Sequence, residues 1–135
     1  MNNNHSPNGV GPLSGLSVML VDDDIDSRGR VLEILRTAGA FVIGIRTPDA
    51  ACHYATASRF DALIVDLPTE EGSQLLHALR ASPKPFAQTP IFALSRARHD
   101  QGYRQLFIGY FLKPVKRDAL TKALARLPRR MDITQ

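Results

Sequence analysis

The sequence predicts an α/β protein, a three-layer sandwich in which helices cover both faces of a five-stranded parallel sheet. Short apolar runs rich in β-branched residues alternate along the chain with segments whose apolar residues recur at helical spacing. Uninterrupted apolar runs are typical of strands that are buried on both faces. Their alternation with helices implies parallel pairing through right-handed crossovers, and 135 residues leave room for one domain.

The first β-α unit begins with the apolar run 18–21, which suits a central strand and stops at three consecutive aspartates. From about Asp26 to Ala38, apolar residues fall at positions i, i+3, i+4 and i+7, which is one face of a helix. Gly39 is expected to end this helix.

The remaining elements follow the same alternation. Thr47 and Pro48 have the composition of a helix start, and Pro68 and Gly72 after the apolar run 61–66 favour a strand there. Three phenylalanines, Phe41, Phe92 and Phe107, are expected in the core. The expected elements are strands at 41–45, 61–66, 90–94 and 107–112, and helices from about 47, at 72–81 and at 115–127.

The two ends of the chain are expected to lie outside the fold. Residues 1–15 are rich in Asn, Gly and Pro and predict a flexible leader, since they offer little apolar surface to bury. The ordered domain is expected at 16–127, followed by a basic tail at 128–135.

Composition narrows the class of protein. Apolar residues make up 44% and charged residues 22%, as in an ordinary globular domain, and the single cysteine excludes an internal disulfide. No apolar stretch approaches the roughly 20 residues that span a bilayer, so we expect a cytoplasmic protein without a membrane partner. The net charge of +4 is scattered over the chain, so no direct nucleic-acid binding is expected.

Polar residues follow four separate apolar runs directly. In a parallel sheet the carboxyl ends of all strands meet at one edge, which is where ligands bind. The residues that this places together are Asp22, Asp23, Asp66, Ser95 and Lys113.

This set of side chains predicts a site for a divalent cation and a phosphoryl group. Clustered carboxylates without thiol or imidazole favour a hard cation such as Mg²⁺. An ammonium group, a hydroxyl and a metal can together hold phosphoryl oxygens. The plainer interpretations are that the acids after the first strand cap the next helix, and that Asp66 is a turn residue.

Asp66 is the expected nucleophile. A carboxylate is ionised at neutral pH and needs no general base to attack phosphorus. The product would be an aspartyl phosphate stabilised by Lys113 and by the hydroxyl of Ser95.

These residues resemble the receiver domains of two-component response regulators, over about residues 16–127. Five features match the pattern of that family in order and at similar separations. They are the pair Asp22-Asp23, the phosphoacceptor Asp66, the hydroxyl residue Ser95, the pair Lys113-Pro114 and the aromatic Tyr110.

The resemblance implies a flavodoxin-like fold with strand order 2-1-3-4-5, and a signalling phosphoacceptor with no other enzymatic activity. It implies Mg²⁺ held by Asp22, Asp23, Asp66 and the main-chain carbonyl of Pro68. It also implies a phosphohistidine donor, either a sensor histidine kinase or a histidine phosphotransfer protein. Ser95 and Tyr110 would act as the switch residues for a protein-interaction surface, and homodimerisation stays open.

Three departures from the family pattern keep a second interpretation open. The loop 67–72 is shorter than usual, Arg96 replaces a small residue, and Ser95 and Lys113 are closer in sequence than usual. These features favour a pseudo-receiver that works by protein contact without phosphorylation.

Two other classes share part of the pattern. A haloacid-dehalogenase-like phosphatase also uses an aspartate, a hydroxyl, a lysine and Mg²⁺, but its nucleophile follows the first strand and its chain is longer. A flavodoxin-like mononucleotide binder would need a Ser-, Thr- and Gly-rich phosphate loop where this chain has three aspartates.

Overall fold

The computed structural model describes residues 10–47, 50–51, 53, 60–66, 89–95 and 107–129. Three predicted features, the helix at 72–81, Pro68 and Arg96, lie outside these residues. Within them the elements are β1 (Ser17–Val21), α1 (Ile25–Thr37), β2 (Phe41–Ile45), β3 (Ala62–Asp66), β4 (Ile91–Ser95), β5 (Gly109–Leu112) and α4 (Arg117–Ala125).

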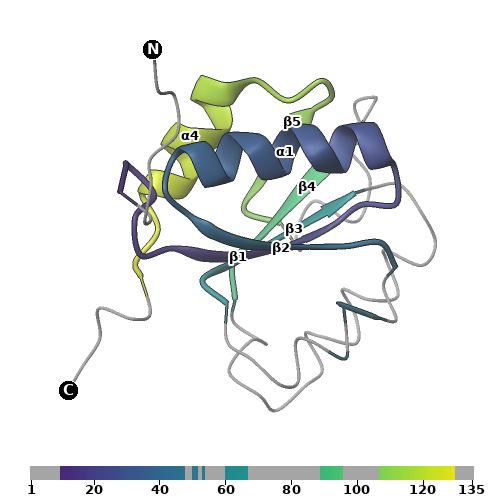
Figure 1. Ribbon diagram of the computed structural model, residues 1–135, viewed down its shortest axis with the longest axis horizontal. Helices are drawn as coiled ribbons and strands as arrows, with labels where there is room; N and C mark the ends of the chain where they lie inside the picture. Colours follow the sequence, from purple (N-terminus) through teal and green to yellow (C-terminus); the bar gives the residue numbers. More distant parts are fainter. Residues whose placement is uncertain are drawn as a thin grey trace.

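All five strands form one parallel sheet in the order β2-β1-β3-β4-β5. This confirms the predicted fold class and strand order. Helices α1 and α4 lie on the same side of the sheet, with α1 running across β1 and β2 (Figure 1). Ala50, Ala51 and His53 have helical backbone geometry, in agreement with the helix expected after Thr47.

The core lies on both faces of the sheet, as continuous apolar strands require. Alternate strand residues join one of two separate clusters. Leu20, Ile64 and Leu94 pack in the cluster that also contains the buried residues of α1 and α4. Val65 and Ala93 belong to the cluster on the opposite face. The described strands are therefore apolar on both faces, which leaves their ends as places for polar chemistry.

Helix α1 starts and stops where local chemistry requires. Asp24 is its N-cap, and the side chain of Asp24 accepts a hydrogen bond from the backbone N–H of Asp26 at 3.1 Å. Gly39 follows the C-cap with φ +101°, a conformation that L side chains rarely adopt. The capping interpretation is thus correct for one of the three consecutive acids.

The end of the expected leader packs onto the domain. The expectation that nothing in residues 1–15 would be ordered is wrong for Leu13, whose side chain is 0% exposed within the core. The backbone N–H of Leu13 donates to Ala38 O at 2.8 Å, and Arg129 donates to Pro12 O at 2.7 Å and to Ser14 O at 3.2 Å. The two bonds of Arg129 join the two ends of the described chain.

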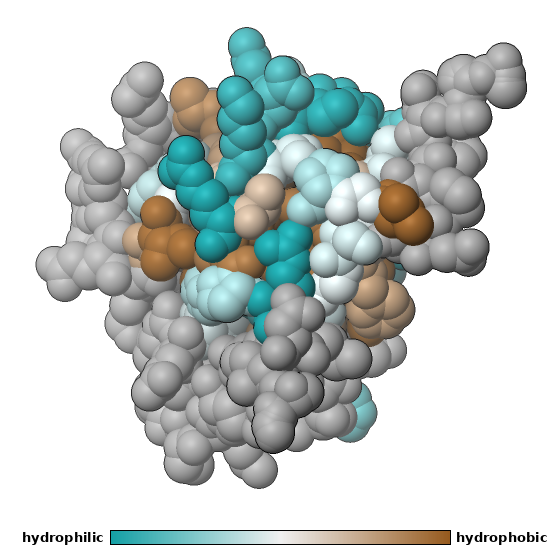
Figure 2. Space-filling model, turned by 90° about the vertical axis from the view of Figure 1, so that its left-hand side faces the viewer, coloured by the Kyte–Doolittle hydropathy of each residue, from teal (hydrophilic) through white to brown (hydrophobic). Residues whose placement is uncertain are grey.

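Arg129 also bears on the expected basic tail at 128–135. Its guanidinium donates to Ala125 O and Leu127 O after α4, as well as to the segment around Leu13. Figure 2 shows the face of the molecule that lies on the left in Figure 1, and hydrophilic side chains gather over its upper part. Arg129, the last described residue, is therefore bonded to the domain.

One core assignment is also wrong. Phe41 is 63% exposed, whereas Phe92 and Phe107 are buried as expected. Phe41 is the first residue of β2, which lies at the edge of the sheet, so its side chain extends past the core. Among the helices of the described ranges, none is long and apolar enough to cross a membrane.

We predict that Leu13→Ala lowers the free energy of unfolding by about 2–4 kcal/mol, because it leaves a cavity in a packed core. Val10→Ala is the matched control, since Val10 is 63% exposed, and its effect should stay within about 0.5 kcal/mol. Urea unfolding of both variants measures this. Equal, small effects would mean that residues 10–15 do not pack as described.

Candidate functional site

The strand register brings the predicted residues to one edge of the sheet. Val21 pairs with Val65, so Asp22 and Asp66 lie at the same level on neighbouring strands. The pairing of β1 with β2 continues one step further, because the backbone N–H of Asp22 donates to Ile45 O at 2.9 Å. At the other side of β4, the backbone N–H of Lys113 donates to Ser95 O at 2.8 Å. The four strand ends therefore meet as expected.

The ammonium group of Lys113 joins two of the acids. Its Nζ lies 2.9 Å from Asp66 Oδ1 and 3.4 Å from Asp22 Oδ2, and the side chain of Lys113 is only 5% exposed. Burial raises the pKa of the Asp66 carboxyl above its ordinary value, and the charge of Asp22 adds to this rise, whereas Lys113 lowers it. The anionic form of Asp66 thus depends on positive charge beside it.

Asp22 is held from several sides. Its side chain is fully buried, and its Oδ1 accepts from the backbone N–H of Asp24 at 3.0 Å. Its Oδ2 accepts from the hydroxyl of Ser27 at 2.6 Å. The main-chain carbonyl of Asp22 accepts from Arg28 Nη1 at 2.8 Å. These bonds satisfy a buried charge that would otherwise be costly.

Three carboxylates are close enough to coordinate one cation. Oxygen atoms of Asp22, Asp23 and Asp66 all lie within 4.8 Å of one another. Asp22 is buried, Asp66 is partly buried and Asp23 is exposed, so the cluster opens to solvent on the side of Asp23. An all-carboxylate set suits hard divalent cations.

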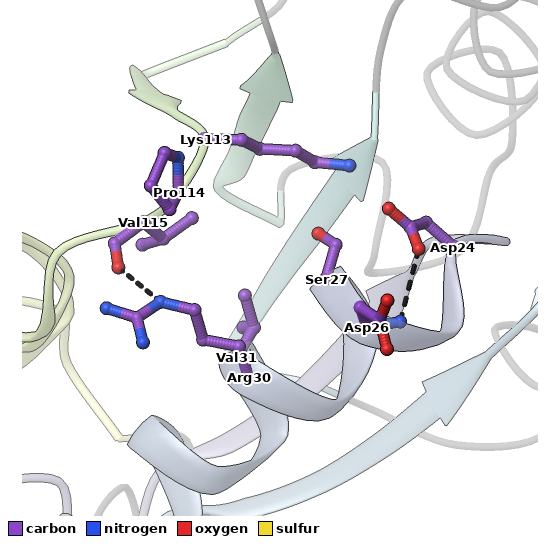
Figure 3. Close-up of a pocket in the computed structure, with 8 residues that line it drawn as sticks. All are labelled: Asp24, Asp26, Ser27, Arg30, Val31, Lys113, Pro114 and Val115. Atoms are coloured by element: carbon purple, nitrogen blue, oxygen red, sulfur yellow. Dashed lines mark hydrogen bonds between the residues drawn. The ribbon is translucent and has the colours of Figure 1, made fainter.

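A groove of about 470 Å³ lies beside this cluster, between the start of α1 and the segment after β5. Its lining includes Asp26, Ser27 and Arg30 from α1 and Lys113 and Pro114 from the other side (Figure 3). Arg30 Nε donates to Val115 O at 2.8 Å, which joins the two sides of the groove. The Lys113 side chain points away from this hydrogen bond, toward Ser27 and Asp24.

The two expected switch residues lie on neighbouring strands. Ser95, at the end of β4, is 1% exposed and pairs with Leu112. Tyr110 pairs with Ala93 and packs its ring edge-on against Phe107, with ring centroids 5.4 Å apart. Such an aromatic contact is worth about 0.5–1.5 kcal/mol beyond burial and favours the present Tyr110 rotamer.

Sequence reasoning missed two residues of this site. Ser27 and Arg28 lie in the segment expected to be a helix from about Asp26 to Ala38 and were not among the expected site residues, yet both bond to Asp22. The available signal was their position in the first turn of α1, five and six residues after Asp22, from which side chains can reach back over the helix start. Of the predicted site residues, Pro68 lies outside the described part of the chain.

Comparison with known proteins agrees with the fold. Residues 18–125 match the response regulator receiver domain family, which is most of the chain, so this protein belongs to that family. A comparison with curated protein sequences gave no match.

Solved structures of receiver domains are similar over nearly their whole lengths. The chemotaxis response regulator CheY4 of Vibrio cholerae is 29% identical, with a TM-score of 0.71, and the match covers 82% of this chain and 97% of that one. A CheY-like receiver domain from Methylobacillus flagellatus is 26% identical, with a TM-score of 0.72 and coverages of 81% and 95%.

A third structure is the receiver domain of the sensor histidine kinase PA1611 from Pseudomonas aeruginosa. It is 29% identical, with a TM-score of 0.73, and the match covers 83% of this chain and 96% of that one. That receiver domain has a magnesium ion coordinated in its active-site cleft.

We predict that Mg²⁺ stabilises the protein against urea through the acidic cluster. At a concentration 100-fold above the dissociation constant, the gain in the free energy of unfolding should be about 2.7 kcal/mol. Asp23→Asn should lose most of this gain, and because Asp23 is exposed the variant should still fold.

Asp118→Asn is the control for charge alone, since Asp118 is exposed in the first turn of α4. It should keep the full Mg²⁺ effect. An Asp23→Asn protein that gains as much as the wild type would place the cation elsewhere.

Proposed function

We propose that the protein accepts a phosphoryl group on Asp66 from a phosphohistidine donor in a Mg²⁺-dependent reaction, and that this switches a protein-interaction surface. The observation that carries the proposal is the position of Asp66 at the end of β3, with Lys113 Nζ 2.9 Å away and two further acids in the same cluster. Membership of the receiver family supports it.

Among the three acids, Asp66 is the best placed to attack. The side chain of Asp22 is fully buried, and both of its oxygens already accept hydrogen bonds, from Asp24 N–H and from the Ser27 hydroxyl. The side chain of Asp66 is 17% exposed, so an incoming donor can reach it from solvent. Asp23 is exposed and lies beyond β1, where it is suited to holding a cation.

In the proposed reaction an oxygen of Asp66 attacks the phosphorus of the phosphohistidine. The phosphorus–nitrogen bond breaks, its electron pair stays on the imidazole nitrogen, and that nitrogen takes a proton from solvent. The product is an acyl phosphate on Asp66. Asp22, Asp23 and Asp66 would hold Mg²⁺, together with the main-chain carbonyl of Pro68 that the family resemblance implies, and the ion would neutralise charge between the two anions that must meet.

Lys113 and Ser95 act on the phosphoryl oxygens in this proposal. The ammonium of Lys113 is already beside Asp66 and is nearly buried, so its attraction for added negative charge is weakly screened. Ser95 ends the strand next to β3 and supplies a hydroxyl. Movement of that hydroxyl toward the phosphoryl group would be coupled to rotation of Tyr110, whose ring borders the same strand.

The proposed partner is a sensor histidine kinase or a histidine phosphotransfer protein. The receiver domain of a sensor histidine kinase is among the structures similar to this chain, which supports the first of these. The groove between α1 and the segment after β5 opens beside Lys113 and leaves one approach to the site uncovered. Homodimerisation in the phosphorylated state is a further proposal that ultracentrifugation can test.

We predict that acetyl phosphate and Mg²⁺ raise the mass of the intact protein by one phosphoryl group, and that chelating the metal abolishes the change. Asp66→Asn should show no increase, because an amide oxygen is a far weaker nucleophile than a carboxylate. Whole-protein mass spectrometry measures both. A wild-type protein that gains no mass would instead be a receiver fold that acts by contact alone.

A further inference from the structure

The hydroxyl of Ser27 makes a hydrogen bond that has no role in the reaction proposed above. It lies in the first turn of α1, and its hydroxyl is 2.6 Å from Asp22 Oδ2. An ionised carboxylate only accepts hydrogen bonds, so Ser27 is the donor. A hydroxyl–carboxylate bond of this length is charge-assisted, which makes it about twice as strong as a neutral one.

Helix capping does not account for this bond. A capping serine accepts a backbone N–H, and the cap of α1 is already provided by Asp24, which accepts from Asp26 N–H. Ser27 instead donates away from its own helix to the end of β1. The Ser27 hydroxyl therefore bonds to an acid of the site, Asp22, and not to the backbone of its own helix.

Ser27 and Lys113 share the same oxygen. Asp22 Oδ2 has the Ser27 hydroxyl at 2.6 Å and Lys113 Nζ at 3.4 Å. The second distance exceeds the usual range for a hydrogen bond, whereas the 2.9 Å from Lys113 Nζ to Asp66 Oδ1 lies within it. The ammonium thus bonds to Asp66, and the hydroxyl takes the place on Asp22 that the ammonium would otherwise occupy.

We propose that Ser27 is a positioning residue of the phosphoacceptor site, whose hydroxyl on Asp22 Oδ2 keeps the ammonium of Lys113 on Asp66. Without that hydroxyl, Oδ2 of the fully buried Asp22 carboxylate loses its hydrogen-bond donor and draws Lys113 toward itself, while Oδ1 keeps its bond from Asp24 N–H. Asp66 then loses the cation that favours its anion and that would hold the phosphoryl oxygens. This inference deepens the proposed function and rests on it for the rate effect, but not for the placement of Lys113.

The chain contains a matched control for this substitution. Ser17 Oγ lies 3.2 Å from Oδ2 of the buried acid Asp61, at the start of β1 and so at the opposite edge of the sheet. Ser17→Ala removes a hydroxyl from a buried carboxylate just as Ser27→Ala does. Ser27→Thr keeps the hydroxyl and is the conservative variant.

The first measurement needs no phosphoryl donor. The side-chain ammonium signal of Lys113 is followed by ¹H–¹⁵N NMR and is identified by its loss in Lys113→Met. We expect it to shift in Ser27→Ala, to stay in place in Ser17→Ala, and to return toward its wild-type position in Ser27→Thr. If Ser27→Ala does not fold, Ser27→Cys gives the same comparison, since a thiol is a weaker donor.

The second measurement is the rate of phosphorylation by acetyl phosphate with Mg²⁺. Ser27→Ala should react roughly tenfold more slowly than the wild type, as expected from losing a hydrogen bond to a charged group, whereas Ser17→Ala should be unchanged.

The two measurements distinguish failure of the proposed function from failure of the role of Ser27. A wild-type protein that takes no phosphoryl group, with a Lys113 signal that still shifts in Ser27→Ala, overturns the proposed function and leaves the role of Ser27 in place. A phosphorylated Ser27→Ala protein with an unchanged rate and an unchanged Lys113 signal overturns the role of Ser27.

Discussion

The ammonium of Lys113 is the one described cation that contacts two acids of the cluster, and the arrangement of the site depends on it. Three carboxylates within 4.8 Å of one another repel, and two of them are partly or fully buried, where water screens little. A buried ion pair is rarely a source of net stability, because desolvation offsets much of the attraction. The role of Lys113 is better understood as keeping a positive charge beside Asp66, where a ligand would bind. Asp66 keeps a raised pKa even so, which leaves it ready for further positive charge.

The topology of the sheet explains how residues far apart in sequence reach this point. Strands β1, β3, β4 and β5 are adjacent and parallel, so their last residues lie side by side whatever the lengths of the connections. Apolar packing on both faces leaves the strand ends as the place where charged groups can meet solvent. The fold therefore brings the strand-end residues together. The bonds that Ser27, Arg28 and Asp24 make to Asp22 set the orientation of this acid, which also lies beside Lys113.

Most of the fold and the strand-end residues could be predicted from the sequence, because apolar runs and helical spacing are local signals. Asp22, Asp66, Ser95 and Lys113 meet as expected. The burial of Leu13 and the exposure of Phe41 were not predicted, because neither follows from local sequence. Phe41 is exposed because β2 is at the edge of the sheet, and Leu13 is buried in a segment that Arg129 bonds to the domain. Ser27 was missed because its partner is chosen by the turn between β1 and α1, whose geometry the residue types alone do not specify.

The identity of the aspartate that takes the phosphoryl group is the most direct test of the proposed site. Borohydride reduces an acyl phosphate and converts that aspartate to homoserine, which peptide mass spectrometry can locate after treatment with acetyl phosphate and Mg²⁺. The burial of Asp22, the exposure of Asp23 and the contact of Lys113 with Asp66 predict homoserine at position 66 alone. Homoserine at position 22 or 23, or at none of the three, would contradict the assignment of Asp66 as the phosphoacceptor.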